Sequence, residues 1–89
     1  MKLFAVEILT PVHRVFAGEV ESIVLPGSEG SFGVLAGHVA LLAGLGAGRI
    51  IARQGVQEHC FNCGPGVADV GPKHVTVLVD YAEEHKQSA

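Results

Sequence analysis

The sequence predicts an all-β protein, a two-sheet antiparallel sandwich or flattened barrel of about nine or ten short strands. Three observations carry this prediction: short runs rich in Val and Ile, a Gly or Pro breaker between successive runs, and apolar residues at alternate positions. Runs spaced about eight to twelve residues apart, each followed by a turn signal, are typical of sandwiches and barrels. With 89 residues, the chain is long enough for one domain.

The strand-like runs follow one another without a linker or an internal repeat. We expect strands at residues 3–9, 14–16, 19–25, 31–35, 39–43, 49–54, 57–62, 67–70 and 75–80. Breakers separate them, among them Thr10-Pro11, Gly18, Pro26-Gly27 and Gly64-Pro65-Gly66. Glycine tolerates a positive φ and proline cannot donate to a ladder, so both residues favour turns here.

Alternation supports the strand assignment at both ends of the chain. Val75, Val77 and Val79 alternate with Thr76, Leu78 and Asp80, and a period of two is the signature of a strand. The run 19–25 is apolar on both faces, which is typical of a strand covered on both sides. Residues 83–89 lack an apolar stripe with which to dock. We therefore expect a domain at 1–82 and a frayed tail at 83–89.

Charge and hydropathy exclude several classes of protein. The formal net charge is −3, and the six Lys and Arg are scattered, so no basic stripe for a nucleic acid exists. The longest apolar stretch, residues 34–48, is interrupted by His38 and several glycines. It is also shorter than the roughly 20 residues that span a bilayer. We expect a soluble protein that does not bind nucleic acid.

Cys60-Phe61-Asn62-Cys63 is a CxxC motif with two chemical interpretations, a redox dithiol or half of a zinc site. A zinc site needs a second ligand pair, and no two histidines have suitable spacing. Extended residues three apart have Cα atoms roughly 10 Å apart, beyond the roughly 7 Å that a disulfide tolerates. Unless the chain turns there, we expect two reduced cysteines that pack as small apolar residues.

The glycine-rich loops do not match phosphate-binding motifs. The loop at residues 27–33 lacks the Lys-Ser/Thr end of a P-loop, and Glu29 would repel a phosphate. The loop at residues 44–48 begins like a dinucleotide fingerprint, but no helix follows it. The five histidines are dispersed, and no catalytic constellation can be assembled from residue order. We therefore expect no enzyme activity, no cofactor and no metal.

One stretch is specific enough to suggest a family. Residues 25–38 read LPGSEGSFGVLAGH and precede Leu41-Leu42. They resemble the run "LPGxEGxxGVLPGH" and its following leucines in epsilon subunits of F-type ATP synthases, within the N-terminal β-sandwich domain. Segments 6–11, 15–20, 67–72 and 75–80 resemble other parts of that domain in the same order. The likeness covers residues 3–82, although Ala36 stands where the family usually has Pro.

This resemblance implies a non-catalytic rotor subunit in the central stalk of a proton- or sodium-driven ATP synthase. Such a subunit links gamma to the membrane c ring for torque coupling and assembly. It lies at the cytoplasmic side of the bacterial inner membrane and touches the membrane only through the c ring. On matching positions, Glu29, Ser31 and His38 are expected to face the c ring. Thr10, His38 and Ala43 are expected to face gamma.

Two alternative functions also fit the sequence. The first is a stand-alone sandwich module that binds a peptide or small ligand, and the second is a redox or zinc protein that uses its CxxC motif.

The resemblance also predicts what this chain should lack. Relatives carry a helical hairpin after the sandwich, but the nine residues after Asp80 cannot hold two helices. We therefore expect a short form without the inhibitory switch and without nucleotide binding.

Overall fold

The computed structural model describes residues 2–85, and that range contains ten strands and no helix. The strands are β1 (Phe4–Leu9), β2 (Arg14–Val20), β3 (Ser22–Gly27), β4 (Gly30–Leu35), β5 (Leu41–Leu45), β6 (Gly48–Gln54), β7 (Gln57–Cys63), β8 (Gly66–Val70), β9 (His74–Val79) and β10 (Ala82–His85). The predicted all-β class is confirmed.

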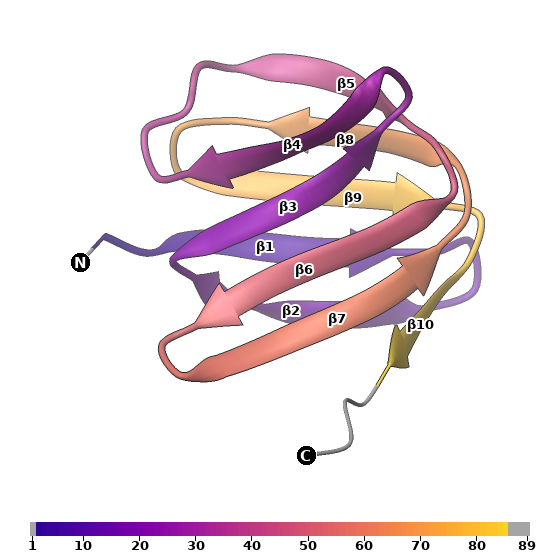
Figure 1. Ribbon diagram of the computed structural model, residues 1–89, viewed down its shortest axis with the longest axis horizontal. Helices are drawn as coiled ribbons and strands as arrows, with labels where there is room; N and C mark the ends of the chain where they lie inside the picture. The colour runs from indigo at the N-terminus through magenta and orange to yellow at the C-terminus, as the bar shows by residue number, and fades with distance from the viewer. Residues whose placement is uncertain (1, 86–89) are drawn as a thin grey trace.

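The strands form two layers that are joined into one continuous path. Nine of them pair in the order β10-β7-β6-β3-β5-β8-β9-β1-β2, while β4 pairs with β3 beside this path. The path folds over on itself, so that β3, β4, β6 and β7 cover β1, β2, β8 and β9 (Figure 1). The result is the flattened, nearly closed sandwich that the sequence predicts.

One pairing departs from the antiparallel rule. β1 runs antiparallel to β2 but parallel to β9, with Val6 opposite Val75 and Ile8 opposite Val77. Turn signals predict the direction of strands that a hairpin joins. They carry no information about β1 and β9, which lie at opposite ends of the chain and meet only in the folded protein.

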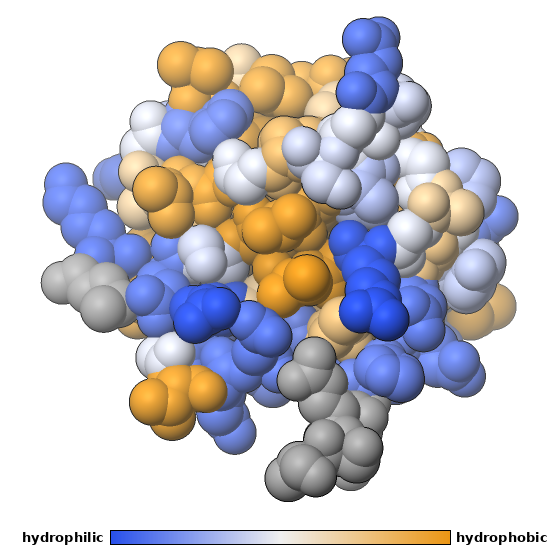
Figure 2. Space-filling view, viewed as in Figure 1, coloured by the Kyte–Doolittle hydropathy of each residue, from blue (hydrophilic) through white to orange (hydrophobic). Residues whose placement is uncertain are grey.

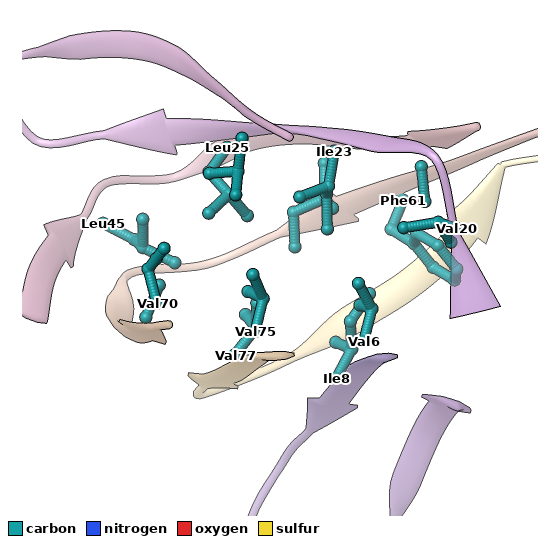
Figure 3. Packing of buried hydrophobic residues seen from close by; sticks show 14 of the residues in the cluster. Val6, Ile8, Val20, Ile23, Leu25, Leu45, Phe61, Val70, Val75 and Val77 are labelled. Atoms are coloured by element: carbon teal, nitrogen blue, oxygen red, sulfur yellow. The ribbon is translucent and has the colours of Figure 1, made fainter. Parts of the chain in front are cut away.

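The core lies between the two layers and is almost entirely aliphatic. Ile23 and Leu25 project from one layer toward Val70, Val75 and other residues of the second layer (Figure 3). Alternation in β9 is confirmed, because its three valines are buried while its intervening residues are less so. The fully or almost fully buried large side chains are Ile8, Val20, Ile23, Leu25, Val34, Ile50, Phe61, Val70, Val75 and Val77.

Two seams close the sandwich between its layers. The first, here called the glycine seam, joins β3 to β5 through backbone groups. Gly27 is the partner of Leu45, the Ser28 amide donates to the Gly44 carbonyl at 2.9 Å, and the Gly46 amide donates to Pro26 at 2.9 Å. Beside this seam, a Cβ on Gly27 would lie 2.5 Å from the Gly30 carbonyl oxygen and one on Gly44 would lie 3.3 Å from the Ser28 side chain, so both positions favour glycine.

The second, here called the aromatic seam, closes β2 against β6 and β7 through side chains. The ring of Phe16 contacts those of Phe61 and His59, at centroid distances of 5.5 and 5.1 Å. The Gln54 amide nitrogen donates to the Glu19 carbonyl at 2.9 Å and adds a polar link between β6 and β2.

The first strand boundaries differ from the prediction. Gly18 does not break the chain but lies inside β2 opposite Val6, and the break comes at Glu21 between β2 and β3. The reason is space, since a Cβ on Gly18 would lie 3.1 Å from Gln54 and 3.3 Å from the Phe16 ring. This glycine fits the limited space beside the aromatic seam and does not form a turn.

Two further boundaries also differ. Pro26-Gly27 continues β3 instead of ending it, because this stretch pairs with Ser31 and Gly30 of β4. The strand expected at 39–43 runs from Leu41 to Leu45, in register with Val70 to Gly66 of β8. The ladder with β8 sets these bounds, and sequence periodicity does not reveal it.

The expectation of a frayed tail at residues 83–89 is wrong for its first part. Residues 83–85 belong to β10, where Glu83 pairs with Asn62 and Glu84 with Phe61 of β7. The prediction asked for an apolar stripe, but an edge strand docks by backbone hydrogen bonds and needs little apolar surface. Residues 86–89 lie outside the described range.

Candidate functional site

The links between strands gather at two opposite ends of the sandwich. One, here called the turn end, carries residues 10–13, 28–29, 46–47 and 64–65. The other, here called the loop end, carries residues 36–40, 55–56 and 71–73. Sequence-predicted site residues fall at both ends, as the course of β3 and β4 in Figure 1 makes clear.

Glu29 occupies the exposed β3–β4 turn at the turn end, and Ser31 follows it at the start of β4. The turn requires glycine at Gly30, where φ is +129°. Beside it lies a shallow hollow of about 240 Å³, whose lining includes Glu29, Phe32, Ala43, Gly27 and Gly44. The hollow brings Glu29 and Ala43 to one surface, although they were predicted to face different partners.

His38 lies at the loop end, in the link between β4 and β5. Its Nδ1 is 2.7 Å from the Val39 carbonyl oxygen, and its amide donates to Leu35 at 3.2 Å. The preceding Gly37 has a φ of +87° and donates its amide to Pro72 at 2.8 Å. These bonds hold the link against the β8–β9 turn and fix the position of the imidazole.

Thr10 shapes the β1–β2 turn at the turn end. Its hydroxyl donates to the His13 carbonyl at 3.2 Å and accepts from the amides of Val12 and His13. Its amide also donates to His13. Turn formation therefore accounts for this residue without a partner, and its role in contact with gamma stays a prediction.

The predicted c-ring set does not form one cluster. Glu29 and Ser31 precede or begin β4, whereas His38 follows its far end. Because β4 has six residues, about 20 Å separates its two ends at about 3.3 Å per residue. One flat contact at the turn end would reach Glu29 and Ser31 but not His38.

Sequence reasoning missed an exposed apolar group beside His38. Leu35, Val39 and Leu42 are 64%, 72% and 73% exposed, and they span the end of β4, the following link and the start of β5. From the sequence alone, these residues would be assigned to the hydrophobic core. Alternation in β4 is the one available signal, since Phe32 and Val34 share the inner face and leave Leu35 on the outer one.

A second apolar area lies on the outer face of the layer that contains β3 and β6. Apolar surface gathers at the centre of that face with charged residues on either side (Figure 2). Strand register places Val24 beside Ile51, and Ile51 beside Cys60. Arg53 and Glu58 form an ion pair of 2.7 Å on the same face.

Both cysteines of the CxxC motif are buried and free in β7. Cys63 packs in the core with Phe61, whereas Cys60 is on the opposite face of the strand. Burial raises the pKa of the Cys63 thiol, the Gly48 backbone lowers it in part, and the Asp80 carboxylate raises it further. The expectation of two reduced, apolar-packed cysteines is consistent with this geometry.

Within residues 2–85, no three His, Cys, Asp or Glu side chains gather in a metal-binding arrangement. The described chain also contains no helix with the length and apolarity to cross a bilayer.

Comparison with known proteins identifies relatives of this sandwich. A family model of the ATP synthase delta/epsilon chain β-sandwich domain matches residues 3–85. The ATP synthase epsilon chain of Caulobacter vibrioides is 38% identical over 77 residues, which cover 86% of this chain and 90% of that relative. The Maridesulfovibrio salexigens epsilon chain is 38% identical over 78 residues, or 88% of this chain but 55% of the relative.

Solved structures show the same fold. A chain of the Euglena gracilis mitochondrial ATP synthase, in an assembly of OSCP, F1 and c-ring, superposes with a TM-score of 0.86 at 21% identity. The match covers 92% of this chain and 53% of the other. A chain of the Tetrahymena thermophila mitochondrial ATP synthase central stalk and c-ring gives a TM-score of 0.76 at 16% identity, covering 92% and 66%.

Proposed function

Because the chain belongs to the family of ATP synthase delta/epsilon β-sandwich domains, we propose that it is a non-catalytic epsilon subunit in the central stalk of an ATP synthase. The observation that carries this proposal is the match over residues 3–85 together with epsilon-chain relatives at 38% identity. In this role it joins gamma to the c ring at the cytoplasmic side of the bacterial inner membrane and transmits torque.

The architecture suits a part that transmits force without a reaction. Its two layers enclose one aliphatic core, and both seams are closed, one by backbone and one by side chains. Close-packed interiors of this kind have low compressibility and transmit strain. The CxxC motif supports no competing function, because its thiols lie on opposite faces of β7.

The proposed contact with the c ring is the turn end, with Glu29 and Ser31. The proposed contact with gamma runs from the hollow at Ala43 along β5 to His38 at the loop end. The exposed Leu35, Val39 and Leu42 support this second surface, since apolar groups gain most when a partner removes them from water. Thr10 stays a candidate for gamma at the turn end.

The experiment measures capture of gamma and c ring from solubilised membranes by the tagged, full-length chain. Glu29→Lys is expected to weaken c-ring capture, and His38→Asp to weaken gamma binding, each about tenfold or more, because a wrong charge at an interface costs several kcal/mol. Glu58→Lys is the matched control, since its exposed side chain lies on β7, which pairs with neither β4 nor β5.

The free energy of unfolding should change by no more than about 0.5 kcal/mol in all three variants, because these side chains are on the surface. Wild-type capture by both Glu29→Lys and His38→Asp would refute the placement of the surfaces. Failure of the unmodified chain to capture gamma would refute the stalk function itself.

A further inference from the structure

His59 ties three strands together in the aromatic seam. Its Nδ1 is 3.1 Å from Glu84 Oε2 on β10, and its Nε2 is 2.8 Å from Gln54 Oε1 on β6. The Phe16 ring of β2 packs against the imidazole. The His59 side chain is 23% exposed and that of Glu84 is 47% exposed. Both ring nitrogens thus have a protein partner in a half-buried position.

The orientation of the Gln54 amide is determined by its other bond. Its nitrogen is 2.9 Å from the Glu19 carbonyl oxygen, which can only accept a hydrogen bond. The amide nitrogen must therefore point to Glu19, and the amide oxygen to His59. An amide oxygen is an acceptor, so the imidazole must be the donor in that bond.

The Glu84 carboxylate is also an acceptor, so both partners of the ring require an N–H. A neutral imidazole carries one N–H and can satisfy one of them, whereas an imidazolium carries two and satisfies both. We infer that His59 is a proton-dependent clamp: the doubly protonated ring bonds Gln54 and forms an ion pair with Glu84, whereas the neutral ring gives up one of these bonds and the ionic part of the Glu84 contact, which loosens β10 as pH rises.

Other charged groups on the surrounding strands lie on the outer faces. Strand alternation places there Glu19 on β2, Arg49 and Arg53 on β6, Glu58 on β7, and Glu83 and His85 on β10. The register shift between Ile8 and Leu9 puts Arg14 opposite Leu9 on the same outer face. Arg14 is engaged with Glu7 and Arg53 with Glu58. Among the described residues of these strands, Glu84 is the charged group that contacts the ring.

The attachment of β10 is sensitive to a single contact because the strand is short and lies at an edge. It has four residues, pairs with β7 alone, and contributes Ala82 to the packing against the core. Loss of the bond from His59 to Glu84 removes its side-chain link to the seam. The rest of the sandwich does not depend on this link.

The test follows amide hydrogen exchange in the full chain at about pH 6 and about pH 8.5, on either side of ordinary histidine titration. Protection in β10 is divided by protection in the β8–β9 pair, which cancels the intrinsic dependence of exchange on pH. This ratio is expected to fall about two- to fivefold as pH rises, the range for a partly exposed ion pair. Ring ¹⁵N shifts of His59 should show an imidazolium at the lower pH.

Two variants on the same strand separate the clamp from a general effect of charge. Glu84→Gln offers an amide that can donate to a neutral ring or accept from a charged one, so the ratio should become independent of pH while β10 stays protected. Glu83→Gln, on the outer face, should keep the wild-type dependence. A ratio that stays constant in the wild type, or that falls equally in Glu84→Gln, would overturn the inference.

Discussion

The two seams close the same sandwich by different chemistry. In the glycine seam, β3 and β5 meet through backbone amides and carbonyls, and Gly27 leaves no room for a side chain beside the Gly30 carbonyl oxygen. In the aromatic seam, β2 meets β6 and β7 through Phe16, Phe61, His59 and Gln54. The backbone cannot move away from a Cβ that a Gly→Ala substitution adds, whereas the end of a side chain can. The glycine seam should therefore be rigid toward substitution, and the aromatic seam more adaptable.

The largest effect should come from the buried anchor of the aromatic seam. Phe61 is 0% exposed, so Phe61→Ala leaves a cavity and should lower the free energy of unfolding by about 3–5 kcal/mol. Urea unfolding followed by circular dichroism measures this loss. A cost below about 1 kcal/mol would mean that the seam collapses to fill the space and is more adaptable than its packing indicates.

Gly27→Ala tests the rigidity of the glycine seam. The new Cβ would lie 2.5 Å from the Gly30 carbonyl oxygen and 3.0 Å from the Phe32 ring. We expect a loss of about 1–3 kcal/mol from overpacking, measured in the same way. Gly33→Ala is the matched control in the next strand, because its Cβ would meet nothing within 4 Å. Equal stability of the two variants would contradict the proposed difference.

Gly18→Ala places the same extra carbon in the aromatic seam. Its nearest neighbours would be the Gln54 amide at 3.1 Å and the Phe16 ring at 3.3 Å, both ends of side chains. Reduced freedom of the unfolded chain contributes about 0.4–1 kcal/mol in favour of alanine. The net change should stay within about 1 kcal/mol. A loss as large as that of Gly27→Ala would remove the distinction between the seams.

Cys63 gives the smallest expected effect, which depends on pH. Its folded pKa is raised above the ordinary value of 9.0, mainly by burial, so the folded chain holds this proton more tightly than the unfolded chain does. The resulting stabilisation is present below the unfolded pKa and is lost as pH rises through the folded one. Unfolding midpoints between neutral pH and about pH 10.5 should therefore fall more steeply in the wild type than in Cys63→Ala. Parallel curves would contradict this.

Local signals in the sequence predicted most of the strands but neither of the seams. Glycines 27, 44 and 46 are visible as breakers, and the valines of β9 are visible as alternation. The aromatic seam was not predictable in this way, because Phe16 and Phe61 are distant in the chain and meet only after folding. The role of Gly18 was misread for the same reason, since its neighbour Gln54 lies on another strand.

The candidate surfaces were predicted by resemblance more than by physical pattern. The run around Glu29 and His38 suggested an interface, but nothing local showed that β4 separates the two residues. The exposed Leu35, Val39 and Leu42 could not be told from core residues, because a one-dimensional pattern does not say which face a neighbouring layer covers. Residues 83–85 were missed because edge pairing is a backbone property.

The parallel pairing of β1 with β9 has a consequence for biosynthesis. β1 leaves the ribosome well before its partner strand, which begins at His74. At about 5–20 residues per second, the hairpin of β1 and β2 waits on the order of several seconds with one edge unpaired. The backbone groups along that edge are a template for pairing with other nascent chains during this interval. Productive folding thus ends late, when the ninth strand pairs with the first and makes β1 an interior strand, while β2 stays at the end of the strand order.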